Sequence, residues 1–396
     1  MNPRADMEVH AGQDDGALVA SAQALRPVLR AEAAEMERTR RLTPAALAAL
    51  REMRAFNLQL ARTYGGPEAD PPTYLRVLEE LARGDASAAW CAMVGAESSG
   101  CINAWLAPAT VRHMLADPYR SAAAVTVVGS GRAVAVPGGY RVTGHWRFAS
   151  NCRHADWLGA LCTLYDGETP RLRENGAPQT RMMFAPVAET ELRDTWHTSG
   201  LCGTASDDFA WHDVFVPEAH GADLFGAARD PVPAWRIPVS LRFAMSKAAV
   251  CCGIARSALD ALQPLLDRTP FTGARAAREE PRVHVALAEA EAALEGGRAF
   301  LYRNIARAWE RVVGDGELDQ PAVAAVRLAI VSAARGALEA TRIAQELGGA
   351  AGIFDPLLDR AGRDLNVARH HVQLQAHVLE DVGRVMLGLA PRNPLF

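Results

Sequence analysis

The chain reads, near its C-terminus, Gln345-Glu346-Leu347-Gly348-Gly349, then Ala350-Ala351-Gly352-Ile353-Phe354, then Arg363-Asp364 and finally Arg369-His370-His371. Adjacent glycines permit a close approach of the backbone to another group. Histidine is the side chain whose ordinary pKa lies nearest to neutral, so a pair of histidines points to acid–base chemistry. This stretch therefore contains both a glycine turn that allows close packing and two histidines that are candidate catalytic residues.

The composition is that of an ordinary globular protein. Its 396 residues are 49% hydrophobic and 22% charged, which is ample material for a large core. The formal net charge of -4 gives little support to a nucleic-acid partner. Seven cysteines occur without CxxC or zinc-ligand spacing, so we expect reduced thiols and no metal site. We find neither a signal peptide nor a stretch of membrane-spanning length, and we expect a cytoplasmic protein without a membrane partner.

Hydrophobic periodicity divides the chain into three parts. Helical spacing runs through 17–40, 44–57, 72–83 and 85–106, and it resumes in 244–266, 283–312, 321–347 and 363–389. In between, β-type runs cover 124–128, 133–136, 140–142, 157–164, 182–186 and 209–216. We therefore predict an α+β multidomain fold with an N-terminal helical domain (1–120), a central β-barrel or sandwich (121–225) and a C-terminal four-helix bundle (236–396).

Five local motifs occur in this order along most of the chain. They are Tyr64-Gly65-Gly66, Phe148-Ala149-Ser150-Asn151, Gly200-Leu201-Cys202-Gly203-Thr204-Ala205-Ser206, Arg268-Thr269-Pro270-Phe271, and Gln345 with Gly348-Gly349. Each resembles a segment of the acyl-CoA dehydrogenase superfamily, whose order of helical domain, β domain and helical bundle is the one predicted above. The resemblance implies a flavin cofactor and a homotetramer built through the C-terminal bundle.

The resemblance also implies which residues bind the flavin. They are Phe148, Ser150, Asn151, Thr204, Ser206, Arg268, Phe271, Gln345, Gly348 and Gly349. In the family, the hydroxyl at the position of Ser150 lies against the flavin ring near N5. Thr204 and Ser206 are candidates for hydrogen bonds to the ribityl or phosphate groups, and the loop from Arg268 to Phe271 reaches the flavin of a neighbouring subunit.

One branch of the superfamily fits best. The segment from Trp146 to Trp157 resembles the W-x-[WF]-[SA]-S-G-x-x-H-A-x-W signature of two-component flavin monooxygenases, although Asn151 replaces the usual glycine. The resemblance implies an oxygenase component that takes reduced flavin (FAD or FMN) from a separate reductase and forms a C4a-hydroperoxyflavin with O2. Its expected reaction is hydroxylation of an aromatic or polycyclic small molecule.

The catalytic residues that this resemblance implies are His371, Ser150 and Glu97. Many dehydrogenases of the superfamily carry a Glu-Gly-Thr whose Glu would fall at Val372, so the carboxylate is lost where the histidines appear. Ser150 is expected to hold the N5 proton. An imidazole with a pKa near neutral suits deprotonation of a phenol, which is the role expected of His371. His370 would point about 100° away on a helix, so only one of the pair should face the flavin.

Two positions depart from the oxygenase pattern. Glu97 stands where several of these enzymes have a histidine, in the segment from Val94 to Glu97, and Asn366 stands where some have another. Glu97 is either a base or a hydrogen-bond partner of a basic substrate, or else a carboxylate on a helix surface. Glu97, Asn366 and His370 are the candidate substrate contacts.

Two alternatives remain open from the sequence. One is a flavin dehydrogenase that desaturates an acyl or carrier-bound substrate with Glu97 or a histidine as base. The other is a non-catalytic flavoprotein that keeps the fold. No GxGxxG motif follows a strand, which agrees with a reductase on a separate chain.

Overall fold

The computed structural model describes residues 5–229, 232–269, 275–314, 316–393 and 396. The helices of the first part are α1 (Ala5–Thr39), α2 (Pro44–Glu52), α3 (Pro71–Gly84), α4 (Ala86–Trp105) and α5 (Pro108–Met114). The helices of the last part are α6 (Val239–Leu262), α7 (Pro281–Val313), α8 (Gln320–Phe354), α9 (Pro356–Ala368) and α10 (Val378–Met386). Phe271, one of the expected cofactor residues, lies outside the described residues.

The strands lie between these two helical parts. They are β1 (Ala123–Thr126), β2 (Gly129–Val136), β3 (Gly139–Trp146), β4 (Trp157–Asp166), β5 (Thr169–Pro170), β6 (Thr180–Pro186), β7 (Glu191–Arg193), β8 (Asp208–Pro217) and β9 (Gly221–Ala222). In the described residues they form one sheet with the path β7-β8-β3-β2-β4-β6-β9. It is mixed, because β1 and β2 each pair parallel with β4 while β3, β6 and β8 pair antiparallel with their neighbours.

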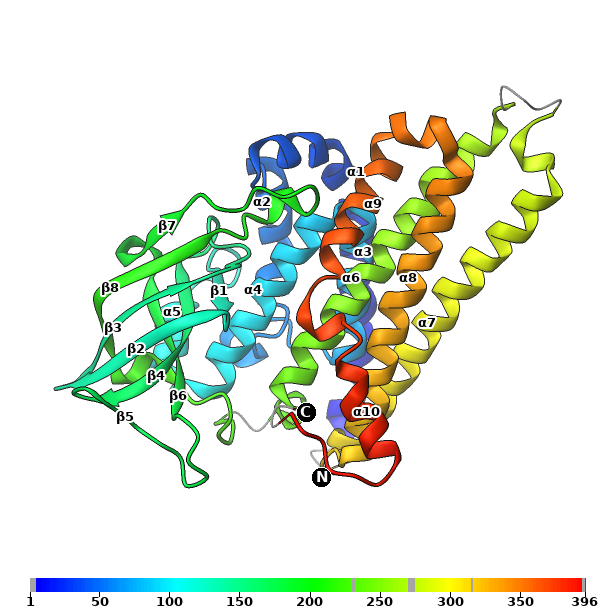
Figure 1. Cartoon of the computed structure of the whole chain (residues 1–396). Helices are drawn as coiled ribbons and strands as arrows, with labels where there is room; N and C mark the ends of the chain where they lie inside the picture. Colours follow the sequence, from blue (N-terminus) through cyan, green and yellow to red (C-terminus); the bar gives the residue numbers. More distant parts are fainter. Residues whose placement is uncertain (1–4, 230–231, 270–274, 315, 394–395) are drawn as a thin grey trace.

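Helix α4 stands at the centre of the molecule. In Figure 1 the sheet lies on one side of α4, and the long helices α6, α8 and α7 follow one another on the other side. Every residue of α4 is buried. Its small side chains allow this: a Cβ at Gly95 would come within 2.7 Å of the Phe56 ring. A helix covered on all sides can present side chains to both the sheet and the bundle.

Local sequence explains where the elements begin. Thr43 and Asp70 cap α2 and α3 by accepting hydrogen bonds from Ala46 N and Thr73 N, and a proline opens each helix. The hairpin from β2 to β3 turns at Pro137-Gly138, where Gly138 has a φ of 82° that favours glycine. These signals explain the agreement between the predicted and observed elements.

Two expectations are wrong. The run 363–389 is not one helix, because α9 ends at Ala368 and the 3-10 helix η9 (Val372–Leu374) and α10 follow. Residues 129–132, left between the predicted β runs 124–128 and 133–136, belong to a strand, because β2 begins at Gly129. By length and composition two helices, Val239–Asp267 and Gln320–Phe354, could cross a membrane. Their apolar windows are 72% and 56% buried inside the molecule, as in core helices of a bundle.

Candidate active site

Four parts of the fold meet at one cavity of about 600 Å³. Its walls come from α4, α6, the sheet side and the chain that leaves α9. The lining residues are Trp90, Val94, Glu97, Val125, Thr126, Val127, Val128, Phe148, Ser150, Trp196, Leu201, Ser206, Phe243, Lys247, Val367, Ala368, His370, His371, Val372 and Gln373. The lining is mostly apolar, with a few polar groups, which is the usual character of a site for an aromatic ligand or cofactor.

The helical walls place an ion pair in this cavity. Trp90, Val94 and Glu97 recur on α4 at intervals of four and three residues, so they share one face. Lys247 on α6 approaches both oxygens of Glu97, at 3.0 and 3.2 Å, and Ser246 Oγ donates to Oε1 at 2.5 Å. Burial raises the pKa of Glu97, while Lys247 and Ser246 oppose that rise. Glu97 is therefore not a surface carboxylate, since it is 5% exposed.

Two loops from the sheet bring hydroxyl groups to the cavity. Ser150 Oγ lies 2.5 Å from Ser206 Oγ and accepts a hydrogen bond from Trp90 Nε1 at 3.2 Å. Backbone strain gathers in the same loops. Four non-glycine residues there have a positive φ: Phe148, Asn151, Leu201 and Ala205. Such conformations persist where surrounding structure enforces them, and they are concentrated at functional sites.

His371 also lines the cavity, on the turn between α9 and η9. Its Nδ1 accepts a hydrogen bond from Gln373 N at 3.3 Å, so the neutral ring carries its proton on Nε2. Burial lowers the pKa of His371 to about 3, and Lys247 adds to this effect. The expectation of a pKa near neutral is therefore wrong, and at pH 7 the ring is a neutral hydrogen-bond donor.

The expectation that only one histidine of the pair faces the cavity is wrong as well. Both His370 and His371 line it, because α9 has ended before them and helical spacing no longer applies. His370 is exposed, and its Nδ1 donates to Asn366 O at 2.6 Å. Asn366 itself is exposed and lies outside the lining, with its side chain accepting from Arg369.

The expected cofactor residues divide into two groups. Phe148, Ser150 and Ser206 line the cavity. Thr204 and Asn151 are fully buried behind it. Among the described residues, neither polar atom of the Asn151 side chain has a hydrogen-bond partner, so a buried amide behind the cavity wall is left unsatisfied.

The second group lies elsewhere. Gln345 packs against Gly362 at the end of α8, and Gly348 packs against Leu358. Gly349 interrupts the helix with a φ of 50°. Arg268 is exposed at the end of the 3-10 helix that follows α6. None of these four residues lines the cavity of the same chain.

Sequence reasoning missed Lys247, although a signal was present. The chain has 42 lysine and arginine residues in total, and Lys247 is the one lysine among them. All the other basic residues of this kind are arginines. The single lysine, with its compact ammonium group, stands where an ion pair lines the cavity. Trp90 and Gln373 were also missed, and no motif marks them.

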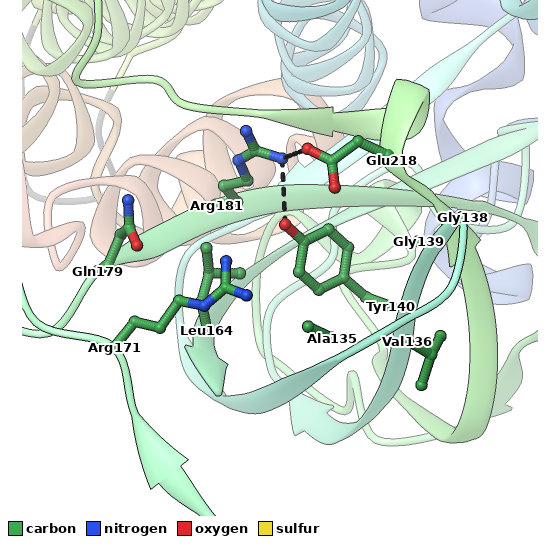
Figure 2. A pocket seen from close by; sticks show the side chains of 10 residues that line it. All are labelled: Ala135, Val136, Gly138, Gly139, Tyr140, Leu164, Arg171, Gln179, Arg181 and Glu218. Atoms are coloured by element: carbon green, nitrogen blue, oxygen red, sulfur yellow. Dashed lines mark hydrogen bonds and ion pairs between the residues drawn. The ribbon is translucent and has the colours of Figure 1, made fainter. Parts of the chain in front are cut away.

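A second cavity, of about 440 Å³, lies within the strands (Figure 2). Figure 2 shows Arg181 directed toward Glu218 and the Tyr140 hydroxyl, and Arg171 in the same wall pairs with Asp166. Its charges are thus already partnered within the strands. It contains none of the expected site residues.

Among the residues that the structure describes, no three His, Cys, Asp or Glu side chains gather as metal ligands. A flavin ring fits the main cavity on two grounds. The walls are mostly apolar, and the polar groups at the wall, Ser150 and His371, suit a heterocycle with hydrogen-bonding edges. Phe148 and Trp196, in edge contact with ring centroids 6.2 Å apart, add aromatic surface.

Comparison with known proteins gives the same family at both ends of the chain. Residues 18–112 match "Acyl-CoA dehydrogenase, N-terminal domain" and residues 245–376 match "Acyl-CoA dehydrogenase, C-terminal domain". The chain is 30% identical to indole-3-acetate monooxygenase of Pseudomonas putida over 365 residues, with 91% of each chain covered. It is 27% identical to the oxygenase component of the FADH(2)-dependent resorcinol hydroxylase of Rhizobium sp., with 95% of each covered.

The solved structures agree in fold. XiaF from Streptomyces sp., in complex with FADH2 and glycerol, has a TM-score of 0.89 at 24% identity and covers 98% of this chain and 99% of its own. The chain therefore belongs to the acyl-CoA dehydrogenase family. Its relatives named above are the flavin-dependent monooxygenases of that family rather than its thioester dehydrogenases.

Proposed function

We propose that this protein is the oxygenase component of a two-component flavin-dependent monooxygenase that hydroxylates an aromatic small molecule. One observation carries the proposal: Ser150 and His371, from distant parts of the chain, line one apolar cavity, while Val372 stands at the expected position of the dehydrogenase carboxylate. The carboxylate that removes a proton from a thioester substrate in the dehydrogenases is therefore missing from its expected position.

Reduced flavin, when bound, supplies the electrons that activate O2. The apolar walls of the cavity keep water from the reacting groups. Ser150 offers a hydroxyl oxygen to the cofactor ring, and Phe148 offers an aromatic face. Asn151 lies buried behind this wall, and its side-chain amide has no hydrogen-bond partner among the described residues. FMN and FAD share the ring that these residues would hold, and either meets this description.

His371 acts first as a hydrogen-bond donor. At pH 7 its neutral ring presents Nε2–H, which suits an oxygen atom carried by the cofactor or the substrate. An anion formed beside the ring would raise the pKa of His371 and allow it to take up a proton. His370, also at the wall, is the second candidate for contact with substrate.

Glu97 and Lys247 recognise the polar group of the substrate. Glu97 Oε2 has Lys247 as its partner, at 3.2 Å, so it retains lone pairs for an O–H or N–H donor. Indole-3-acetate and resorcinol, the substrates in the names of two relatives, both carry such a donor on the ring system. We infer that the substrate of this protein is an indole-like or phenolic compound.

The partners follow from this assignment. A separate flavin reductase supplies the reduced cofactor, and O2 is the second substrate. We propose a cytoplasmic homotetramer in which Arg268, Phe271, Gln345, Gly348 and Gly349 contact the flavin of a neighbouring copy, since the four that the structure describes lie away from the cavity of their own chain.

The test supplies reduced FMN or FAD and ¹⁸O2 with a panel of indoles and phenols. Mass spectrometry measures the labelled product, and a peroxide assay measures uncoupled turnover. His371→Ala and Ser150→Ala are expected to lower product at least tenfold and to raise the peroxide share. His377→Ala, outside the cavity lining, is the matched control and keeps product formation. Stoichiometric peroxide with every aromatic tested would overturn the proposal.

A further inference from the structure

A chain of hydrogen bonds runs from the cavity wall into the sheet loops. Trp90 Nε1 donates to Ser150 Oγ at 3.2 Å, and Ser150 Oγ lies 2.5 Å from Ser206 Oγ. Ser206 Oγ lies 2.7 Å from Thr204 Oγ1, which in turn lies 2.8 Å from the Leu201 carbonyl oxygen. All three hydroxyl groups are at least nine-tenths buried. We call this chain the hydroxyl relay.

The direction of every proton in the relay follows from its inner end. A carbonyl oxygen only accepts, so the Thr204 proton must lie on the bond to Leu201 O. Thr204 therefore accepts from Ser206, and Ser206 in turn accepts from Ser150. The indole N–H of Trp90 only donates, so it supplies a bond to Ser150 without taking one. Each bond polarises the next in the same sense.

The outer end of the relay is therefore an acceptor. Ser150 donates its single proton to Ser206 and accepts from Trp90 with one lone pair. Its second lone pair is left for another donor. Ser150 keeps 7% of its surface open and lines the cavity. A group bound against Ser150 without disturbing the relay must present a hydrogen-bond donor.

We propose that Thr204 and Ser206 are positioning residues that hold Ser150 as a hydrogen-bond acceptor, and that this makes the cavity prefer reduced over oxidised flavin. The inference rests on the proposed binding of flavin in this cavity. Reduction adds protons to ring nitrogens that are bare acceptors in the oxidised ring. The free lone pair of Ser150 accepts a hydrogen bond from the N–H of the reduced ring. The oxidised ring presents a bare nitrogen there, so two acceptors face each other and no hydrogen bond forms.

Thr204→Val is the sharpest test because it removes the inner acceptor without changing the volume greatly. Leu201 O keeps two donors, Trp196 Nε1 at 2.9 Å and Thr204 N at 3.2 Å, so no buried carbonyl is orphaned. Ser206 is then free to donate to Ser150, and the Ser150 proton can turn to the cavity. We expect the ratio of the oxidised to the reduced dissociation constant to fall roughly tenfold.

The measurement is anaerobic titration of the full-length protein with oxidised and with reduced FMN and FAD, followed by flavin fluorescence or calorimetry. Ser206→Ala is the second relay variant, and it is expected to lower the ratio in the same direction. Thr198→Val is the control: Thr198 Oγ1 donates to Gly200 O at 2.7 Å in the same loop and has no part in the relay. Its ratio should equal that of the wild type.

The midpoint potential of the bound flavin gives an independent readout, because preferential binding of the reduced form raises it. The relay variants are expected to lower this potential toward that of free flavin. An unchanged ratio and potential in both relay variants, with flavin still bound, would overturn the inference alone. Absence of flavin binding to the wild type would instead remove the proposed function.

Discussion

Burial shifts the pKa of several ionisable groups toward the side that favours the neutral form. Burial lowers the pKa of His371 to about 3 and that of His154 to about 4. Burial raises the pKa of Asp364 to about 7, with nearby Asp85 adding to the rise. The common cause is the loss of water around a charge, which favours whichever form is uncharged. Of these three groups, Asp364 is the one whose pKa lies near neutral pH.

Asp364→Asn is expected to flatten the dependence of stability on pH. The pKa of Asp364 is higher in the folded than in the unfolded state, so its contribution is fully present below about pH 4 and is lost as pH rises through about 7. The loss over this whole range is on the order of 4 kcal/mol for a shift of this size. Asn keeps an acceptor for the Leu201 N–H, which now bonds Asp364 Oδ1 at 2.6 Å.

The measurement is thermal unfolding of the wild type and Asp364→Asn between pH 5 and 8.5. Other groups titrate in both proteins, so the difference between the two curves isolates Asp364. The wild type should lose stability relative to the variant as pH rises. Two parallel curves would contradict the assignment.

The ion pair of Glu97 and Lys247 allows a paired test of substrate recognition. Glu97→Gln alone leaves a buried ammonium without a counter-charge and is expected to cost about 3–5 kcal/mol of stability. The double variant Glu97→Gln with Lys247→Met removes both charges and should recover most of that loss. In steady-state kinetics, the double variant should raise the KM for an indole or phenol at least tenfold. Flavin affinity within twofold of wild type would separate this effect from misfolding, whereas an unchanged KM would exclude the role of Glu97.

At the scale of elements, small residues set how closely the helices approach. A Cβ at Gly253 on α6 would meet Glu79 O of α3 at 2.3 Å, whereas a Cβ at Gly296 on α7 would meet no atom of the described residues within 4 Å. Both glycines lie inside long helices, so the same substitution has opposite consequences. Close packing of α3 on α6 keeps α6, with Lys247, next to α4.

Gly253→Ala is expected to destabilise the protein by about 1–3 kcal/mol because backbone, not a flexible side chain, stands in the way. Gly296→Ala is its matched control and should stabilise by roughly 0.5–1 kcal/mol through the better helix propensity of alanine. Urea unfolding at constant pH measures both. Similar effects in the two variants would contradict the close approach of α3 and α6.

At the scale of the molecule, the cavity joins parts that are far apart in sequence. Figure 1 shows α4 between the sheet and the C-terminal helices, and all three supply lining residues. Glu37 on α1 adds a further link, since it pairs with Arg360 at 2.9 Å and Arg363 at 2.6 Å on α9. A ligand in the cavity would therefore contact the sheet side, α4 and the C-terminal helices at once.

Reduced flavin is therefore expected to stabilise the whole molecule. A ligand at 100 times its dissociation constant adds about 2.7 kcal/mol to the free energy of unfolding. Anaerobic thermal unfolding with reduced FMN, reduced FAD and no ligand measures the shift and shows which flavin binds more tightly. Ser150→Ala should show a smaller shift at equal flavin concentration, and a shift in neither flavin would contradict binding in the cavity.

Much of the fold is readable from the sequence because its signals are local. Hydrophobic spacing, the caps Thr43 and Asp70, and the turn at Gly138 depend on neighbouring residues, so the elements fall where they are predicted. Motifs at Ser150, Ser206 and His371 likewise point to residues that the cavity brings together. The broken helix after Ala368 escaped prediction, because the apolar spacing continues through the turn.

Tertiary structure alone decided the chemistry of these side chains. Burial moved the pKa of His371 away from neutral, and the turn after α9 set both histidines against the cavity. The partner of Glu97 lies on α6, 150 residues away, and no local pattern specifies that meeting. The sequence by itself determined which elements form and which side chains are available. Protonation, proton direction and pairing depend on the groups that folding places within a few ångströms, so they were set only by the packed molecule.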